Sequence, residues 1–304
     1  MQLTPHDEFL HKGYPKTDTT SWKENYYFNF VDENADAMGI FHASIQRHNK
    51  LIAVKVLIVI DSELFSYKNN IAWPTEAIDH LDDSVVVGDD KLCFRIVEPF
   101  LKHQVLFSDG GTSITLNYKE RFPEYLYPEK ENTDQSLSVV HYEQGMHVSG
   151  EINYKGRTRS IECFGHRDHT WGFRDESGLV GWHWIAIQSE RSTWNFALVS
   201  RNDGTSSKSG FISNGDMAQS ITDVEVLSVE PNAKGEPINA HYKVTTENGD
   251  VFHVSAERHK YIPIPIDGAP GTSAFVHENI SKFIVEETGE KGIGIDEHMV
   301  SSST

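Results

Sequence analysis

"DGGTSITLNYKERF" (109–122) contains the pattern that decides the fold. A turn pair, Asp109-Gly110, is followed at once by a run rich in β-branched and aromatic residues, which is typical of a β-hairpin. Similar runs recur at short intervals along the chain, separated by further turn pairs such as Asn248-Gly249. Helical periodicity is almost absent, and the one short candidate is "WPTEAIDHLDD" (73–83). The sequence therefore predicts an all-β protein.

The charge balance limits the classes of partner. The 304 residues include 45 acidic and 27 basic side chains, which gives a formal charge of −18 at pH 7. Binding to nucleic acid depends on neutralising phosphates with lysine and arginine, and anionic membrane surfaces select for the same charge. We therefore expect no nucleic-acid partner and no membrane partner.

The cysteines and the apolar runs indicate the compartment. Cys93 and Cys163 are far apart and form no CxxC or CxxH pair, so we expect two buried, reduced thiols. The N-terminal "MQLTPHDEFLHKGYPK" lacks the apolar run of a signal peptide. The longest apolar run, "LIAVKVLIVI" (51–60), contains Lys55 and is too short to span a bilayer, so it is read as a buried strand. These features predict a soluble, cytoplasmic protein.

The length and one polar segment suggest two domains. A chain of this size can hold one large β domain or two ordinary ones. The segment "YPEKENTDQS" (127–136) is polar and charged, and strand-like runs resume directly after it. We therefore expect an N-terminal β domain over 1–135 and a C-terminal β-barrel domain over 136–304. No internal repeat of fixed period is present, which disfavours propellers and solenoids. Two sandwiches or barrels of the kind that enclose an apolar ligand remain.

The stretch "CFGHRDHTWGFRD" (163–175) concentrates the titratable side chains. Successive side chains of a strand point to opposite faces, so Arg167, His169 and Trp171 would share one face. His166 and Asp168 would lie on the other face, together with Thr170. Because this parity separates the two imidazoles of the HxxH pair, and a zinc site needs several converging ligands, we expect no metal.

An acid–base function fits the same stretch better. A histidine near a carboxylate, or an aspartate in an apolar cavity, can transfer a proton to a substrate, which makes Asp168 and His169 candidates. Trp171 offers a π surface that can stabilise a developing carbocation or hold an apolar substrate. The structural alternative is that Arg167, Arg174 and Asp175 form an ion-pair network, with Asp168, that braces a turn at Gly172.

Two neighbouring runs supply candidate substrate-binding residues. In "GLVGWHWIAIQ" (178–188), Trp182 and Trp184 alternate with His183, so either the tryptophans or the histidine would face a cavity. In "VHYEQGMHVSGEI" (140–152), Tyr142 is a further candidate. In the same run, Glu143 beside a glutamine is typical of a solvated face, unless the strand lines a polar wall.

Taken in order, "HYEQGMHVSGEI", "FGHRDHTWGFRD", "GWHWIAIQ" and "GIGIDEH" resemble blocks of a family of two-domain, lipocalin-like proteins. This family includes carotenoid 1,2-hydratase (hydroxyneurosporene synthase) and AttH-like proteins. The resemblance implies two consecutive lipocalin-like β-barrel or β-sandwich domains. It also implies protonation of a double bond to a tertiary cation that water captures, without a metal or organic cofactor.

The aspartate–histidine–x–tryptophan–glycine core of the family falls on Asp168, His169 and Trp171. A later strand of the hydratases carries a tyrosine and an aspartate one residue apart, but "STWNFALVS" (192–200) contains no carboxylate. If the chain is an enzyme, its acid must lie elsewhere, with Asp168 and His169 first and Glu297 third.

Two functions follow from these observations. The first is a cofactor-independent acid–base enzyme, namely a hydratase or dehydratase, an isomerase or a cyclase, acting on a hydrophobic terpenoid- or polyketide-like small molecule. The second is a non-catalytic, lipocalin-like carrier of a hydrophobic small molecule. A fold of this kind hosts more than one reaction, so the site has to decide between them.

Overall fold

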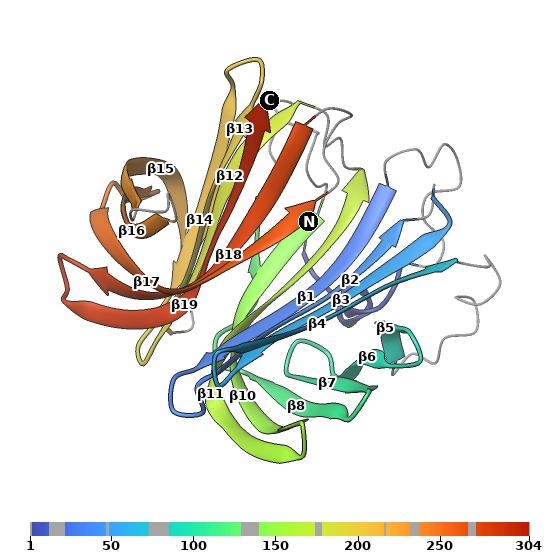
Figure 1. Ribbon diagram of the computed structural model, residues 1–304. Coiled ribbons are helices and arrows are strands. Elements are labelled where there is room, and N and C mark those ends of the chain that lie inside the picture. The colour runs from blue at the N-terminus through green and yellow to red at the C-terminus, as the bar shows by residue number, and fades with distance from the viewer. Residues whose placement is uncertain are drawn as a thin grey trace. The chain divides into compact units, whose positions relative to one another are not determined.

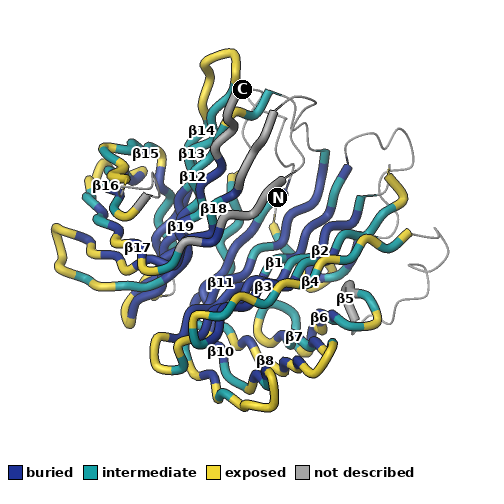
Figure 2. Tube along the Cα trace, in the orientation of Figure 1, coloured by how far each residue is buried: buried dark blue, intermediate teal, exposed yellow. Residues whose placement is uncertain are grey.

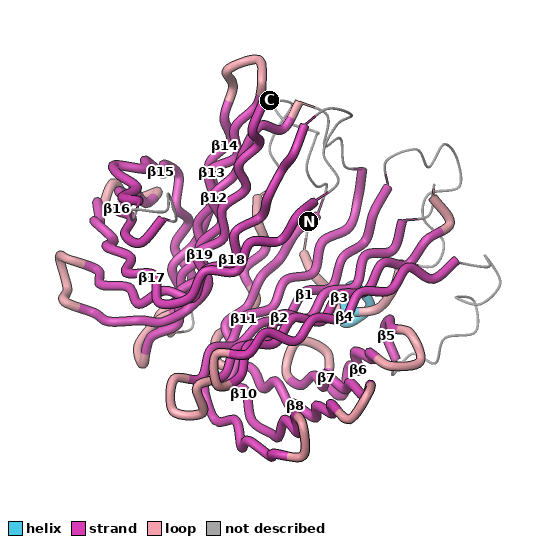
Figure 3. Tube along the Cα trace, in the orientation of Figure 1, coloured by secondary structure: helices cyan, strands magenta, loops and turns pink. Residues whose placement is uncertain are grey.

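The computed structural model describes residues 2–11, 22–46, 49–72, 85–128, 140–173, 178–215, 217–231, 237–266 and 272–303. The chain divides into two compact units, Met1–Asp175 and Glu176–Thr304, which are called unit 1 and unit 2 below (Figure 1). Strands account for most of the described residues, and the only helix among them is a short 3-10 turn (Figure 3). The predicted all-β fold is confirmed.

Unit 1 consists of one 3-10 turn and a single antiparallel sheet. Its elements are η1 (Pro5–Glu8), β1 (Trp22–Asp32), β2 (Ala37–Gln46), β3 (Leu51–Ile60), β4 (Glu63–Ala72), β5 (Val85–Gly88), β6 (Leu92–Glu98), β7 (Lys102–Asp109), β8 (Thr112–Glu120), β9 (Tyr125–Leu126), β10 (Val140–Tyr154) and β11 (Arg157–Phe173). The strand order is β4-β3-β2-β1-β11-β10-β8-β7-β6-β5, and β9 pairs with β10. The first and last long strands of the unit, β1 and β11, are therefore neighbours in the middle of the sheet.

The sheet of unit 1 is curled around its core. Phe65 of β4 packs against Phe107 of β7, with 5.7 Å between ring centroids, although these strands lie far apart in the strand order. Apolar residues at alternate positions of β1, β2, β3, β8 and β10 form one buried cluster inside this curl. Figure 2 shows the corresponding burial along most of β1 and β2 and along the second half of β11. Alternation of apolar residues at a period of two thus produces a sheet with a defined interior face.

Unit 2 is a closed antiparallel barrel. Its strands are β12 (Leu179–Ser189), β13 (Thr193–Arg201), β14 (Ser206–Ser213), β15 (Ala218–Pro231), β16 (Pro237–Thr246), β17 (Val251–Ile266), β18 (Thr272–Val285) and β19 (Glu290–Ser303). Each strand pairs with the next, and β12 closes the barrel by pairing with β19. Inward side chains such as Ile185, Phe196 and Tyr242 fill the interior. The predicted pair of lipocalin-like β domains is confirmed as a curled sheet followed by a barrel.

The division between the units lies at 175/176 and not after residue 135 as expected. The polar segment at 127–136 precedes β10, but β10 and β11 pair with β8 and β1 of the first sheet. A polar stretch therefore marks a connection inside one unit here. Turn composition identifies where a strand stops, but it does not identify the sheet to which the next strand returns.

Other local expectations have mixed outcomes. The Asp109-Gly110 pair does connect β7 to β8, with positive φ at Gly110, and "LIAVKVLIVI" is strand β3. Both cysteines are free thiols, but each is half-buried, so the expectation of full burial was wrong. The candidate helix at 73–83 lies outside the described residues. Within the described part of the chain, no helix has the length and apolar composition required to cross a bilayer.

Candidate functional site

Strand β11 presents different chemistry on its two faces, as parity predicts. On the interior face of unit 1, Arg167 Nε donates to Gln144 Oε1 at 2.9 Å and the His169 ring stacks on Tyr26 at 4.1 Å. On the opposite, outer face, His166 Nε2 lies 2.6 Å from Glu143 Oε2. The structure therefore brings His169 and Trp171 together and separates both of them from Asp168.

Glu24 of β1 is the centre of the interior cluster. Its side chain is fully buried, and Oε1 accepts hydrogen bonds from His169 Nε2 and His11 Nδ1, both at 2.9 Å, and from the Tyr26 hydroxyl at 3.1 Å. Burial alone would raise the pKa of Glu24, but the hydrogen bonds from His11 and His169 outweigh it and lower the pKa to about 2. We call this set, His11, Glu24 and His169, the interior relay.

The buried end of the interior relay has a defined proton arrangement. The Tyr142 hydroxyl lies 2.9 Å from His169 Nδ1, and burial raises the pKa of Tyr142 well above its usual value, so the tyrosine is the donor. Burial likewise lowers the pKa of His169. His169 is therefore neutral, accepts at Nδ1 and donates from Nε2 to Glu24.

The other end of the relay reaches the surface through His11. The His11 side chain is 20% exposed, its ring stacks on Trp171 at 4.2 Å, and its backbone N–H donates to Glu24 Oε2 at 3.1 Å. Its Nε2 lies 3.7 Å from Asp7 Oδ1. Partly buried apolar side chains surround Trp171 and its buried neighbours, namely Leu3, Phe100, Leu126 and Phe173. The accessible imidazole of this cluster is thus that of His11, beside an apolar rim.

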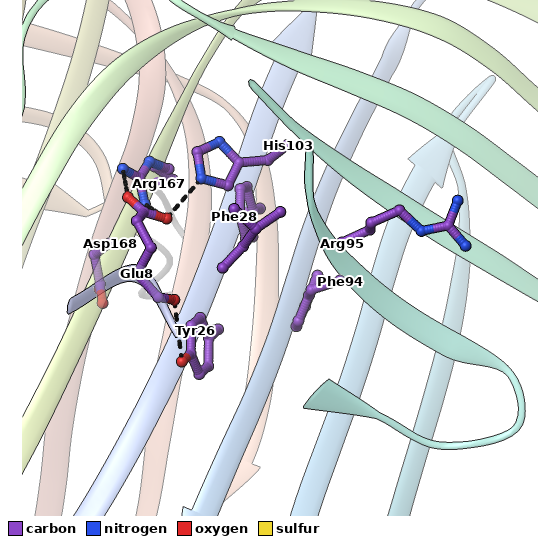
Figure 4. A pocket seen from close by; sticks show the side chains of 9 residues that line it. Glu8, Tyr26, Phe28, Phe94, Arg95, His103, Arg167 and Asp168 are labelled. Atoms are coloured by element: carbon purple, nitrogen blue, oxygen red, sulfur yellow. Dashed lines mark hydrogen bonds and ion pairs between the residues drawn. The ribbon is translucent and has the colours of Figure 1, made fainter. Parts of the chain in front are cut away.

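Arg167 holds the N-terminal segment that carries His11. Arg167 Nη2 donates to Glu8 Oε1 at 2.6 Å, and His103 Nε2 lies 2.8 Å from Glu8 Oε2 (Figure 4). Burial opposes the ionisation of Glu8, but Arg167 and His103 outweigh it, so the pKa of Glu8 falls far below its usual range. Beside these groups lies a small cavity with room for about one water molecule, lined also by Tyr26 and Phe28.

Arg167 therefore forms an ion pair, as predicted for its structural role, but its partner is Glu8. Arg174 and Asp175, the partners expected from sequence, lie outside the described residues. The turn expected at Gly172 was wrong, because β11 continues to Phe173 and Gly172 pairs with Lys23 of β1. Gly172 has a φ of 143°, a conformation that suits glycine, so the residue that resembled a turn is accommodated within the strand.

The outer face of the same strands carries a second cluster. Glu143 is fully buried, with His166 Nε2 at 2.6 Å from one oxygen and His141 Nε2 at 3.0 Å from the other. Tyr127 stacks on the His141 ring at 4.5 Å, and Asp168 lies directly across from Glu143 in the strand register. The solvated position that is typical of a glutamate beside a glutamine was therefore wrong for Glu143, which is buried in a polar wall.

The candidate residues of β12 lie in unit 2, where the alternation places His183 inside the barrel. His183 Nδ1 lies 3.2 Å from His298 Nε2, and an ion pair of Arg258 and Asp296 at 2.6 Å lies beside them. Trp182 points to the other face and donates from Nε1 to Glu297. Trp184 shares this outer face by parity. Of the predicted substrate-binding residues, only Tyr142 belongs to the interior cluster of unit 1.

Comparisons with known proteins place the chain in a family. A model described as "Domain of unknown function (DUF7064)" matches residues 4–301. The chain belongs to this family. The comparison with curated proteins gives no match.

Several solved structures share the fold of this DUF7064 protein. An AttH-like protein from Nitrosomonas europaea is 14% identical, with a TM-score of 0.70 over 100% of this chain and 97% of that one. Kievitone hydratase from Nectria haematococca is 12% identical, with a TM-score of 0.61 over 99% and 93% of the two chains. CghA, solved with Sch210972, is 9% identical, with a TM-score of 0.61 over 94% and 90%. The expected likeness in fold to AttH-like and hydratase-related lipocalin-like proteins is confirmed.

Sequence reasoning missed His11 and Glu24 of this DUF7064 protein. Glu24 did carry a signal, because in "SWKENYYFNF" (21–30) it alternates in phase with Trp22, Tyr26 and Phe28, and a carboxylate in an apolar phase marks a buried polar group. His11 lies outside any periodic run and carried no such signal. Among the described residues, two sets of side chains have the ligand types and spacing to hold a metal ion, namely the interior relay and the set of His141, Glu143 and Asp168.

Proposed function

We propose that this member of the DUF7064 family is an acid–base enzyme that protonates a carbon–carbon double bond of a hydrophobic, terpenoid- or polyketide-like small molecule. The observation that carries the proposal is a partly exposed imidazole, His11, which a buried carboxylate orients and an indole supports from one side. Oriented His–carboxylate pairs beside an apolar surface are a recurring means of proton transfer to and from substrates.

The proton transfer follows from the hydrogen bonds of the relay. Glu24 accepts the Nδ1–H of His11, so in this proposal the proton is given by Nε2, which lies 3.7 Å from Asp7 Oδ1. The protonated ring gives its Nε2 proton to one carbon of the double bond, and the π electrons of that bond form the new C–H bond. The neighbouring carbon becomes a cation, which the Trp171 face stabilises. Glu24 stabilises the imidazolium before transfer, as the carboxylate of a His–carboxylate pair does.

The fate of the cation sets the product class. Attack by water, followed by return of its proton to His11, gives a hydrated product and restores the imidazolium. Loss of a neighbouring proton to His11 gives an isomer. Attack by a second double bond closes a ring and moves the positive charge to a further carbon, and loss of a proton from its neighbour to His11 then gives the neutral cyclic product and restores the imidazolium. Relatives of the same fold support this range, since one is named a hydratase and another was solved with Sch210972.

Within this proposal, the predicted site residues have different roles. His169 and Tyr142 are positioning residues, because His169 donates to Glu24, Tyr142 in turn donates to His169, and both side chains are fully buried. Asp168 lies on the opposite face of β11 and does not share in this proton transfer. The substrate-binding role of Trp182, Trp184 and His183 stays a prediction for unit 2.

A complementation experiment tests the proposal and does not require the substrate to be identified first. The gene is deleted in its source organism and restored as wild type, His11→Ala, Glu24→Gln or His253→Ala. The last variant is a matched control, because His253 forms an exposed pair with Glu287 far from the relay in sequence. Solvent extracts are compared by mass spectrometry. We expect wild type and His253→Ala to convert one hydrophobic compound to a hydrate or an isomer, and both relay variants to accumulate the precursor.

Two outcomes contradict the enzyme. Conversion that is equal in wild type and His11→Ala removes the interior relay as the site. A hydrophobic compound that co-purifies with the wild-type protein, without any product depending on it, favours the carrier function instead.

A further inference from the structure

The outer cluster of unit 1 brings three potential metal ligands to one face. His141 and Glu143 are two residues apart on β10, so their side chains share a face, and Asp168 is the direct cross-strand partner of Glu143. One ligand atom of each of the three residues lies within 4.8 Å of the other two. The set comes from two long, paired strands, which position the side chains rigidly.

The orientation of His141 distinguishes this set from the interior relay. In the relay, His11 Nδ1 lies 2.9 Å from Glu24 Oε1 and forms a hydrogen bond with it. His141 Nε2 is buried and forms an ion pair with Glu143 Oε1 at 3.0 Å, but no partner among the described residues has hydrogen-bond geometry to it. Two ligand atoms about 3 Å apart that do not aim at each other are expected when both aim at one ion, since zinc–ligand bonds are about 2.0–2.2 Å long.

Electrostatics also favour a cation at this position. Like charges directly opposite each other on neighbouring strands are destabilising, and Glu143 and Asp168 are such a pair. The second oxygen of Glu143 is engaged by His166 Nε2 at 2.6 Å, which fixes the plane of the carboxylate. Metal-binding carboxylates are commonly held in this way by a hydrogen bond from a neighbouring residue.

We propose that His141, Glu143 and Asp168 form a binding site for a divalent first-row transition-metal ion. One imidazole nitrogen and two carboxylate oxygens suit zinc, manganese or iron, and His166 acts by orienting Glu143. The His141 side chain is 25% exposed although its Nε2 is buried, which places the set close to the surface of unit 1. This proposal departs from the sequence-based expectation of no metal, which rested on the separation of His166 from His169 by parity, because the ligands proposed here come from two paired strands.

Zinc binding to tag-free protein tests the site directly. After removal of bound metal with EDTA, isothermal titration calorimetry measures zinc affinity for wild type, Asp168→Asn, His141→Ala and His11→Ala. We expect wild type to bind one zinc ion at this site, and Asp168→Asn and His141→Ala to weaken this binding at least tenfold. His11→Ala removes a histidine of similar exposure from the interior relay, and it should bind zinc as wild type does.

Thermal melts with and without zinc compare each variant with itself, so a variant that is merely less stable is not mistaken for one that has lost the site. Zinc should raise the melting temperature of wild type and His11→Ala, but not that of Asp168→Asn, which keeps the shape of the side chain. Zinc affinity and zinc-dependent stabilisation that are unchanged in Asp168→Asn, or absent from wild type, would overturn the proposal. Neither readout requires turnover, so the result is separate from the test of the proposed enzyme.

Discussion

At the scale of single residues, strand parity predicted more than motif matching did. It placed His169 with Trp171 and apart from Asp168, because a period of two is a local property of any strand. It could not bring Glu24 to His169, because their hydrogen bond joins residues 145 positions apart. That contact depends on β1 pairing with β11, and non-local pairing has no signature in a single run of sequence.

The two ends of the interior relay should differ in their effect on stability. His169→Ala removes a fully buried ring with two hydrogen bonds and leaves the buried charge of Glu24 with fewer donors, so we expect the free energy of unfolding to fall by about 3 kcal/mol. His11→Ala removes a partly exposed ring and should cost about 1 kcal/mol or less. Urea denaturation measures both. An equal, large loss in the two variants would mean that His11 is a structural residue.

At the scale of elements, the alternation of β12 was correct, but its direction was not determined by the sequence. Trp182 and Trp184 do face away from His183, yet either face of such a strand could be interior. The choice is made by closure of the barrel, in which β19 brings Asp296 and His298 against the His183 side. A strand with polar and aromatic residues on both faces gives no burial signal of its own.

Because it lies inside the barrel, His183 should make unit 2 sensitive to acid. Burial, together with the nearby His298 and Arg258, lowers the pKa of His183 to about 3. The folded state then binds fewer protons than the unfolded state, whose histidine has a pKa near 6.5. The stabilisation is therefore complete above pH 6.5 and is lost as the pH falls from 6.5 to 3.

Melting temperatures of wild type and His183→Gln across this pH range check the prediction. Glutamine keeps a polar group at the position but does not titrate. The difference in melting temperature between the two proteins should shift in favour of His183→Gln as the pH falls. A difference that stays constant from pH 7 to pH 4 would show that His183 is protonated alike in the folded and unfolded states.

At the scale of the whole molecule, the spacing of strand-like runs and turn pairs was sufficient to predict the all-β class of fold. The resemblance of four sequence blocks predicted which solved proteins share this fold. The position of the division was misjudged because a polar segment inside unit 1 resembles a linker. Prediction of the candidate site is limited in the same way, because local sequence patterns do not show which distant segments meet. The blocks around Asp168 and His169 pointed to the strand that carries His169 of the interior relay, while the partly exposed histidine of the relay comes from the N-terminal segment, which Glu8 ties to Arg167.

The central claim, proton transfer from His11 to carbon, is tested most directly by turnover in deuterated water. Purified wild-type protein is incubated in D2O with the hydrophobic extract of the deletion strain, and the product is exchanged back into H2O before mass spectrometry. Because the Nε2 proton of His11 exchanges with solvent, the account predicts one carbon-bound deuterium per product molecule with wild type and no product with His11→Ala. Product that forms without carbon-bound deuterium, or that forms equally well with His11→Ala, would contradict the account.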